Sequence, residues 1–155
     1  MAELIHPTEV IEESNDWSDG DLAIDDSYST WATVTNYNTN PSARMILGLG
    51  GFKNIDAVIA HLSSGDTQKF YKFYVDVYID SQWIGAGVAT WPGIGNELIE
   101  FGQTFNTDRI GVRARLIEPP NEDYLNDIKV RVVSAVKVRA LVNQALAGSD
   151  RKGLV

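Results

Sequence analysis

The densest group of candidate metal ligands lies in the stretch NDWSDGDLAIDDSYSTW, residues 15–31. It holds five aspartates and two tryptophans, with no lysine or arginine. Loop carboxylates are ligands for Ca²⁺, but the EF-hand spacing fails, because aligning Gly20 with the loop glycine puts Trp17 at a ligand position. A different structural calcium site would draw on Asp19, Asp21, Asp25 and Asp26. The alternative is a polar loop in which Asp25 or Asp26 caps a turn.

Residues for nucleophilic or acid–base catalysis do not form a recognisable pattern. Of the two histidines, His61 follows an apolar strand, and the adjacent serines 63 and 64 lack a G-x-S-x-G elbow. Asp76 and Asp80 would lie about 13 Å apart on one strand, too far for a glycosidase pair. Asp76 is expected to face solvent beside Lys72. No catalytic group is predicted, no cofactor other than the calcium is expected, and the protein is not expected to be an enzyme.

Aromatic side chains suggest a binding surface. On the strand predicted at residues 70–80, Tyr74 and Tyr78 share one face with Phe70. Such rings are common at protein interfaces and also stack on sugars, and burial of this face is a third option. Trp83 and Trp91 flank IGAGVAT and would line a groove at the loop end, or pack in the core. The candidate sugar contacts are Tyr74, Tyr78, Trp83 and Trp91.

Basic side chains form a second candidate surface. Arg113 and Arg115 point outward from one predicted strand, as do Arg131, Lys137 and Arg139 from another. If the two strands are neighbours, these side chains form a basic stripe that could receive an acidic arm of an adjacent copy. An outward basic row also protects a sheet edge from aggregation without any partner. The candidate interface residues are Tyr74, Tyr78, Arg113, Arg115, Arg131, Lys137 and Arg139.

Composition bounds the class of protein. The 155 residues suggest one domain, and the net charge of −8 argues against nucleic acid as a partner. There is no cysteine, which excludes disulfides and a cysteine-ligated zinc site. No apolar run approaches the roughly 20 residues that span a bilayer, and the first residues do not resemble a secretory signal. We therefore expect a soluble protein made in a cytoplasm.

Alternation with period two dominates the rest of the chain. It is clearest in DIKVRVVSAVKVRALV, KFYKFYVDVYID and RIGVRARLIE, and shorter runs are TWATVT, RMILGLG, DAVIAHL and QWIGAGVA. Turn signals separate these runs. The pattern predicts an all-β fold, an antiparallel β-sandwich of jelly-roll type with about seven or eight strands. The domain is expected over residues 16–142, with an acidic N-terminal arm at 1–15 and a C-terminal tail at 143–155.

The order of four short motifs resembles a β-jelly-roll module that recurs in structural proteins of tailed phages. The motifs fall at Asp25–Thr30, Leu47–Phe52, Ile110–Arg113 and Asn126–Val132. The module is also distantly similar to galactose-binding-like carbohydrate modules. The closing strand runs past its usual end here, and an arm flanks each side, which suggests a separate virion subunit.

The resemblance implies a non-enzymatic structural role. The first expectation is a capsid decoration protein, or another head or tail surface subunit, that binds other virion proteins and forms a homo-oligomer such as a trimer. It would be located in the virion after synthesis in the host cytoplasm, without nucleic-acid or membrane contacts. The alternative is a carbohydrate-binding, lectin-like module of a tail or secreted protein.

Overall fold

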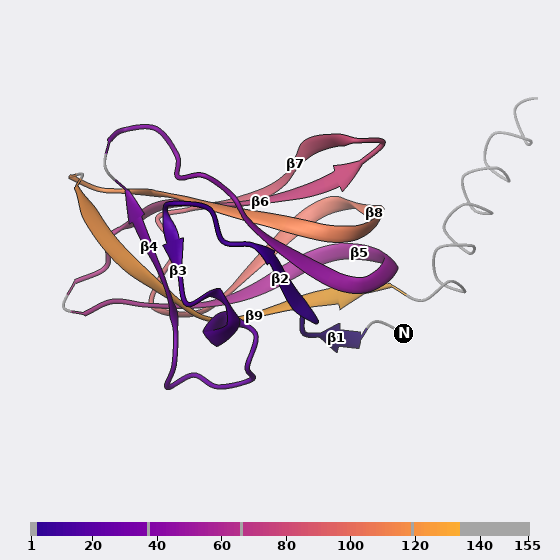
Figure 1. Ribbon diagram of the computed structural model, residues 1–155, viewed down its shortest axis with the longest axis horizontal. Helices are drawn as coiled ribbons and strands as arrows, with labels where there is room; N and C mark the ends of the chain where they lie inside the picture. Colours follow the sequence, from indigo (N-terminus) through magenta and orange to yellow (C-terminus); the bar gives the residue numbers. More distant parts are fainter. Residues whose placement is uncertain (1–2, 37, 66, 119, 134–155) are drawn as a thin grey trace, which may run out of the picture.

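The computed structural model describes residues 3–36, 38–65, 67–118 and 120–133 (Figure 1). These residues form nine strands, all paired antiparallel, and one short 3₁₀ helix, which confirms the predicted all-β antiparallel fold. The elements are β1 (Glu3–Ile5), β2 (Glu9–Glu12), β3 (Trp17–Ser18), η1 (Gly20–Ala23), β4 (Ala32–Asn36), β5 (Met45–Ser63), β6 (Phe70–Ile79), β7 (Gln82–Thr90), β8 (Gly95–Leu116) and β9 (Asn121–Val132).

The strands follow the order β3-β4-β9-β5-β8-β6-β7, with β1 paired to β9 and β2 paired to β5. The long strands β5 and β8 each contribute to two parts of the sheet. Residues 45–48 of β5 pair with residues 109–112 of β8 and with β2, whereas residues 53–62 pair with residues 95–107 of β8 and mostly also with β9. Gly50 and Gly51, at φ 76° and 126°, lie between these two parts of β5, in a conformation that favours glycine. The change of backbone direction at these glycines allows β5 to pair in both parts of the sheet.

One cluster of buried apolar side chains joins the two parts of the sheet. It includes Phe73 and Val75 of β6, Ile110 of β8, and Ile128 and Val130 of β9, all with no exposed surface. Burial of each such side chain contributes roughly 1.5–3 kcal/mol. These are the inward positions that the period-two pattern predicts. The alternate positions of β6 and β8 therefore form an outer face.

The structure differs from the sequence predictions at the N-terminus. Part of the segment expected to be an arm lies in the sheet, since Glu3–Ile5 pairs with β9 and Glu9–Glu12 pairs with β5. The segments are short and carry acidic residues at several positions, so they show no clear alternation. The predicted continuation of the last strand to residue 142, and the tail at 143–155, lie outside the described residues. No helix long and apolar enough to cross a membrane occurs in the described part of the chain.

The strand order also corrects the predicted basic stripe. It required the strands that carry Arg113 and Arg131 to be neighbours, but β5 lies between β8 and β9. Arg113 consequently lies on the outer face shared with β6, and Arg131 forms an ion pair with Asp56 at 2.7 Å. Lys137 and Arg139 lie outside the described residues.

Candidate functional site

The outer face of β6, β7 and β8 brings together four of the predicted aromatic and basic residues. Antiparallel register places Tyr74 opposite Arg113 on β8, and Tyr78 opposite Trp83 on β7. Alternation puts further side chains of these strands on the same side. We call this surface the aromatic–arginine face; it consists of Arg44, Tyr74, Asp76, Tyr78, Trp83, Arg109 and Arg113.

A buried carboxylate lies at the centre of this face. The Asp76 side chain is 2% exposed, and its Oδ2 accepts hydrogen bonds from Nε of Arg44 at 2.7 Å and from Nε of Arg113 at 2.8 Å. Nη2 of Arg113 donates a further bond to Oδ1 at 3.3 Å. The expectation of a solvent-facing Asp76 beside Lys72 is therefore wrong, because two guanidinium groups cover the carboxylate. Sequence reasoning also missed Arg44, which begins the run RMILGLG and lies just before β5.

The guanidinium groups stack on the aromatic rings of the face. Arg113 lies 4.8 Å from the ring centroid of Tyr74, and Arg44 lies 5.0 Å from that of Trp83. Arg109 lies 5.1 Å from the Tyr78 ring, which itself packs against Trp83 at 5.0 Å. Such cation–π contacts contribute about 0.5–1 kcal/mol each at exposed sites. The result is a rigid face in which guanidinium groups already occupy part of the ring surface.

Gly111 lets two large side chains lie flat on this face. A Cβ atom added at Gly111 would lie 2.9 Å from Cδ of Arg44 and 3.0 Å from Cζ3 of Trp83. Contacts this short would force Arg44 and the Trp83 ring to shift, so the absence of a side chain at this position favours the observed packing.

A small hollow lies at the loop end of the same sheet. Its volume is ≈ 260 Å³. We call it the loop-end hollow; it is lined by Thr39, Tyr71, Trp91, Arg115, Leu116, Ile117 and Glu118. Of the four predicted sugar contacts, Trp91 lines this hollow. Tyr74, Tyr78 and Trp83 lie on the aromatic–arginine face instead.

Trp91 is both exposed and fixed. The residue is 60% exposed, and its backbone has a φ of 51°, an uncommon conformation for a bulky residue. Its N–H donates a hydrogen bond to the carbonyl of Tyr71 at 2.8 Å, and the two rings lie 4.9 Å apart. Arg115 also stacks on Tyr71, with its guanidinium 5.0 Å from the centroid of the Tyr71 ring. Glu118, also in the lining, has a φ of 49°.

Tyr71 was expected on the inner face of its strand. The register between β6 and β8 shifts between Phe70 and Lys72, so Phe70 is buried instead and Tyr71 reaches the loop-end hollow. A shift of one residue exchanges the two faces of a strand, and no local sequence signal indicated it.

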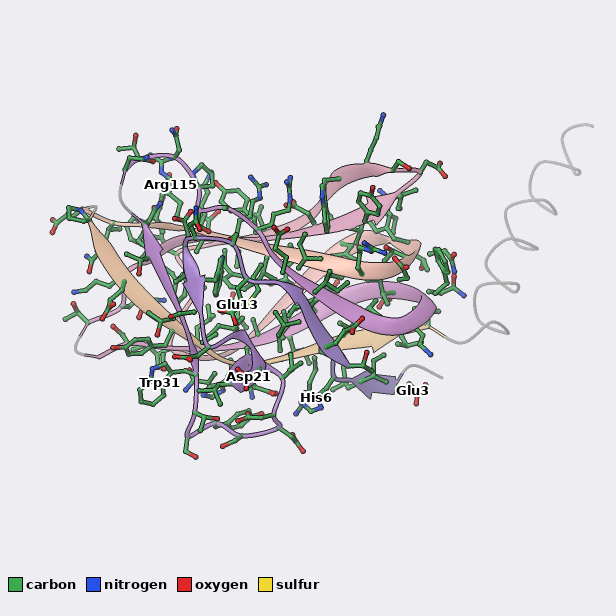
Figure 2. All side chains as sticks on the ribbon, viewed as in Figure 1. Glu3, His6, Glu13, Asp21, Trp31 and Arg115 are labelled. Carbon is green, nitrogen blue, oxygen red and sulfur yellow. The ribbon has the colours of Figure 1, made fainter. Side chains whose placement is uncertain are left out.

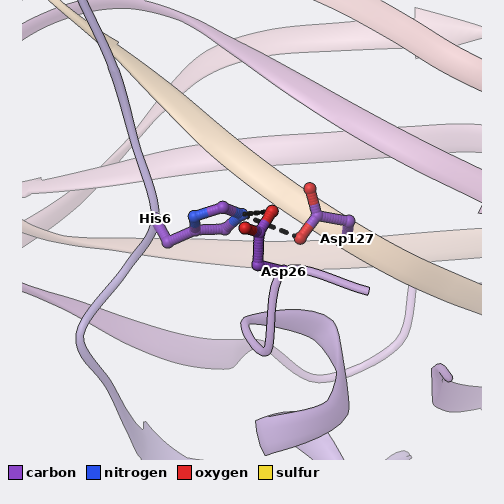
Figure 3. Close-up of side chains that lie close together, drawn as sticks. All are labelled: His6, Asp26 and Asp127. Carbon is purple, nitrogen blue, oxygen red and sulfur yellow. Dashed lines mark hydrogen bonds and ion pairs between the residues drawn. The ribbon is translucent and has the colours of Figure 1, made fainter. Parts of the chain in front are cut away.

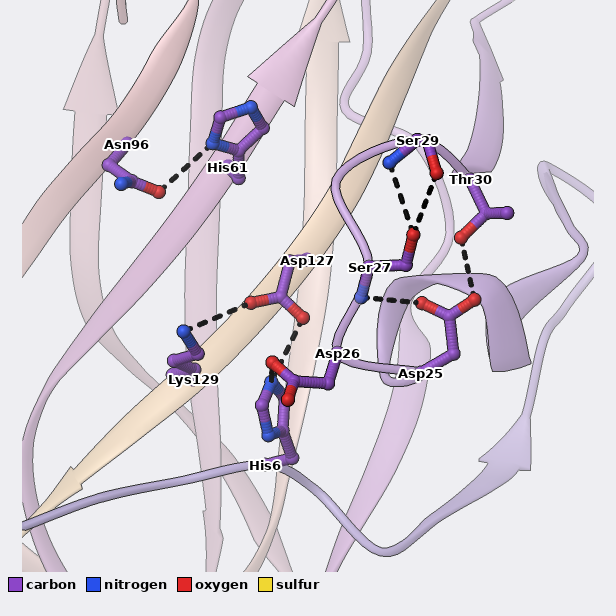
Figure 4. Close-up of polar contacts among 10 residues, drawn as sticks. All are labelled: His6, Asp25, Asp26, Ser27, Ser29, Thr30, His61, Asn96, Asp127 and Lys129. Carbon is purple, nitrogen blue, oxygen red and sulfur yellow. Dashed lines mark hydrogen bonds and ion pairs between the residues drawn. The ribbon is translucent and has the colours of Figure 1, made fainter.

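The predicted calcium ligands do not form one group within the described residues. Asp25 accepts hydrogen bonds from the Ser27 N–H at 3.1 Å and from the Thr30 hydroxyl at 2.6 Å (Figure 4), which is the turn-capping role given as the alternative. Asp19 precedes η1, and its backbone carbonyl accepts a hydrogen bond from the Leu22 N–H. Asp21 lies within η1, and its carbonyl accepts one from the Ile24 N–H.

Asp26 instead approaches His6 and Asp127 (Figure 3). Nε2 of His6 lies 3.0 Å from Oδ1 of Asp127 and 3.4 Å from Oδ1 of Asp26. The Asp127 side chain is 3% exposed. The pKa of Asp127 is raised above its usual value, because the effect of burial outweighs the opposing effects of His6 and Lys129. Sequence reasoning placed His6 in an arm and did not consider Asp127, because 121 residues separate the two.

The second histidine has a packing role in the structure. The His61 ring stacks on Tyr28 at 4.0 Å, and its Nδ1 lies 3.0 Å from Oδ1 of Asn96 (Figure 4). The Ser63 hydroxyl donates to Oδ1 of Asn126. His61 and Ser63 thus hydrogen-bond to amide groups of other residues.

No protein-family model matches the chain, and no curated protein sequence matches it. Its fold matches solved structures of carbohydrate-binding modules. The family 32 module of AlyQ, in complex with 4,5-unsaturated mannuronic acid, has a TM-score of 0.64 at 12% identity, over 83% of this chain and 97% of that one. Chitosan-binding module 2 of a chitosanase/glucanase from Paenibacillus sp. IK-5, in complex with chitotriose, has 0.59 at 17% identity, over 84% and 94%. The family 32 module of C. perfringens NanJ, in complex with galactose, has 0.58 at 13% identity, over 84% and 92%.

Likeness at these identities shows a shared β-sandwich fold. It agrees with the predicted distant similarity to galactose-binding-like modules. The matched structures described above provide no link to phage virion proteins, so that resemblance depends on the sequence motifs alone. The chain has the fold of carbohydrate-binding modules.

Proposed function

We propose that this protein is a non-catalytic carbohydrate-binding module and that it binds a saccharide in the loop-end hollow. The observation that carries the proposal is Trp91, a 60% exposed residue that lines a hollow of ≈ 260 Å³ and whose backbone is held by a hydrogen bond to Tyr71. A sugar presents C–H groups on one face of its ring, and an exposed aromatic ring offers these an apolar surface. The fold shared with carbohydrate-binding modules supports the proposal.

The polar lining of the hollow suits the hydroxyl groups of a saccharide. The Arg115 guanidinium can donate hydrogen bonds and the Glu118 carboxylate can accept them, and Thr39 adds a hydroxyl. Binding sites for small ligands combine an aromatic wall with a few such polar groups. The left-handed backbone at Trp91 and Glu118 is consistent with this proposal, since strained residues often occur at ligand sites.

The aromatic–arginine face extends the proposed site. Tyr74, Tyr78 and Trp83 continue along the outer face, where a longer chain of sugars could contact them. Because the guanidinium groups of Arg113, Arg109 and Arg44 already stack on these rings, we propose secondary contacts here and the primary contact at Trp91.

Titration calorimetry of Trp91→Ala tests the proposal. A saccharide array first identifies a ligand for the natural protein, and it includes chitotriose, galactose and mannuronate oligosaccharides. Trp91→Ala is expected to weaken binding by about tenfold or more, the loss of one stacked aromatic contact. The matched control is Trp31→Ala, since Trp31 is 41% exposed and packs on Tyr124. Figure 2 labels Trp31 on the side of the molecule opposite Arg115.

Two results would contradict the proposal. One is the absence of binding to every saccharide on the array. The other is equal binding by Trp91→Ala and Trp31→Ala. Tyr74→Ala should have a smaller effect than Trp91→Ala, because the Arg113 guanidinium covers one face of that ring. Loss of binding in Tyr74→Ala alone would move the primary contact to the aromatic–arginine face.

A further inference from the structure

Three side chains from distant parts of the chain meet beside β9. His6 comes from the link between β1 and β2, Asp26 from the loop after η1, and Asp127 from β9 itself (Figure 3). One atom of each, Nε2 or a carboxylate oxygen, lies within 4.8 Å of the others. In neutral imidazole, one nitrogen offers at most one proton. A single Nε2–H therefore cannot serve both facing carboxylates fully.

We infer that His6, Asp26 and Asp127 bind a divalent transition-metal ion such as Zn²⁺. Bonds from zinc to nitrogen or carboxylate oxygen are about 2.1 Å long. At that length, two ligand atoms lie about 3.0 Å apart at a right angle and about 3.4 Å apart at a tetrahedral angle. The distances from Nε2 to the oxygens of Asp127 and Asp26 are 3.0 Å and 3.4 Å. Two of the three distances between ligand atoms therefore match those of ligands that share one ion, and the third is at most 4.8 Å.

The ligand set selects the class of ion. Ca²⁺ takes six to eight oxygen ligands, whereas imidazole suits Zn²⁺ and its transition-metal neighbours. Asp26 has a side chain that is 75% exposed, and that of His6 is 25% exposed. Water can therefore complete the coordination. The inferred ion thus differs from the calcium expected at the acidic loop.

Neighbouring groups hold both carboxylates in place. Oδ2 of Asp127, the oxygen that does not face His6, lies 3.7 Å from Nζ of Lys129 (Figure 4), an ion pair that restrains this carboxylate. The loop that carries Asp26 is fixed on one side by the Asp25 turn and on the other by a 2.9 Å hydrogen bond from Asn126 to the Tyr28 carbonyl. Preorganised ligands lose less freedom on binding.

The charge of the cluster favours a cation. Its two carboxylates outnumber the one ammonium group beside them, that of Lys129. The bound ion would join the N-terminal segment to β9. That segment pairs with the sheet through two short strands, β1 of three residues and β2 of four residues. Metal binding is therefore expected to stabilise residues 3–12 against local opening.

Thermal unfolding of the full chain tests the inference. After dialysis against chelator, micromolar ZnCl₂ is expected to raise Tm by about 5 °C, and CaCl₂ is expected to have little effect. His6→Ala and Asp26→Asn should abolish the Zn²⁺ shift. Asp21→Asn is the matched control for Asp26, because Asp21 is an exposed aspartate of the same acidic stretch outside the cluster. His61→Ala is the control for His6, and both controls should keep the shift.

Three outcomes would overturn the inference: no Zn²⁺ shift in the natural protein, a Zn²⁺ shift that persists in both His6→Ala and Asp26→Asn, or a shift with Ca²⁺ alone that Asp21→Asn removes. If His6→Ala does not fold, Asp26→Asn decides, since that side chain is largely exposed. Limited proteolysis gives a second readout: Zn²⁺ should slow cleavage within residues 1–16 of the natural protein and not of Asp26→Asn.

Discussion

Among single residues, Asp76 is expected to contribute most to the stability of the aromatic–arginine face, because it pairs with both Arg44 and Arg113. Replacing it with asparagine leaves Arg44 and Arg113 crowded together without their shared carboxylate. Loss of one partner of a buried ion pair is strongly destabilising. Since the arginines are partly exposed, we expect Asp76→Asn to lower the free energy of unfolding by about 2 kcal/mol in urea denaturation. Asp108→Asn, which removes a partly exposed partner of Arg109, should cost under about 1 kcal/mol. Equal losses would contradict the central role of Asp76.

Asp123 is a second residue whose effect can be measured, here through pH. The residue is fully buried, and burial raises its pKa from 3.8 to about 6. The folded state therefore binds this proton more tightly than the unfolded chain, so the contribution of Asp123 to stability is present at low pH and is lost as pH rises from about 4 to about 6. The change for two pKa units is at most about 3 kcal/mol. Asp123→Asn should flatten the profile of unfolding free energy across this window. An unchanged profile in the variant would show that Asp123 titrates normally.

At the scale of elements, Gly111 allows the side chains of Trp83 and Arg44 to pack directly on the backbone of β8. Gly111→Ala would place a methyl group within 3.0 Å of both side chains. The flexible Arg44 can move, but the Trp83 ring must shift. We expect a loss of about 1–2 kcal/mol in unfolding free energy and a change in tryptophan fluorescence. Gly93→Ala is the control, because nothing lies within 4 Å of a Cβ there. Wild-type fluorescence in Gly111→Ala would mean that Trp83 does not pack as described.

The distribution of charge belongs to the scale of the whole molecule. Five cations lie on or beside the outer face of β6 and β8, namely Arg44, Lys72, Arg109, Arg113 and Arg115. In the described part of the chain their ion pairs involve two carboxylates, Asp76 and Asp108. This face is basic on a protein whose net charge is −8. If the proposed function holds, the face favours acidic saccharides over neutral ones.

Salt dependence tests this electrostatic preference. Binding of an acidic oligosaccharide should weaken at least about threefold between low and high ionic strength, because salt screens exposed charges. Arg115→Gln should reduce both the affinity and the salt dependence. Arg131→Gln removes the same charge from β9 and should change neither. Salt-independent binding with a neutral sugar preferred would contradict the preference and leave the proposed site intact.

The virion role and the homo-oligomer remain predictions at this scale. β7 ends the strand order and exposes Ile84 and Val88, and an open edge strand can pair with another copy. Light scattering measures the solution mass. A trimer or other closed oligomer would support the assembly prediction, and a monomer would leave saccharide binding as the remaining role.

Local alternation was enough to predict parts of the long strands and many of their inner positions. Phe73, Val75, Ile110 and Ile128 are buried where the pattern puts them, because side chains of a strand alternate whatever the strand pairs with. Tyr74 and Tyr78 lie on the outer face for the same reason. The turn formed by Asp25 was also readable, since its contacts span only a few residues.

Tertiary structure alone decided the strand order, the burial of Asp76 and the meeting of His6 with Asp127. The order places β5 between β8 and β9 and so separates Arg113 from Arg131. A register shift in β6 carries Tyr71 to the hollow beside Trp91. These features depend on pairings between residues far apart in the chain. Periodicity fixes the direction of a side chain within its own strand, and only the pairing of strands determines which other side chains it meets.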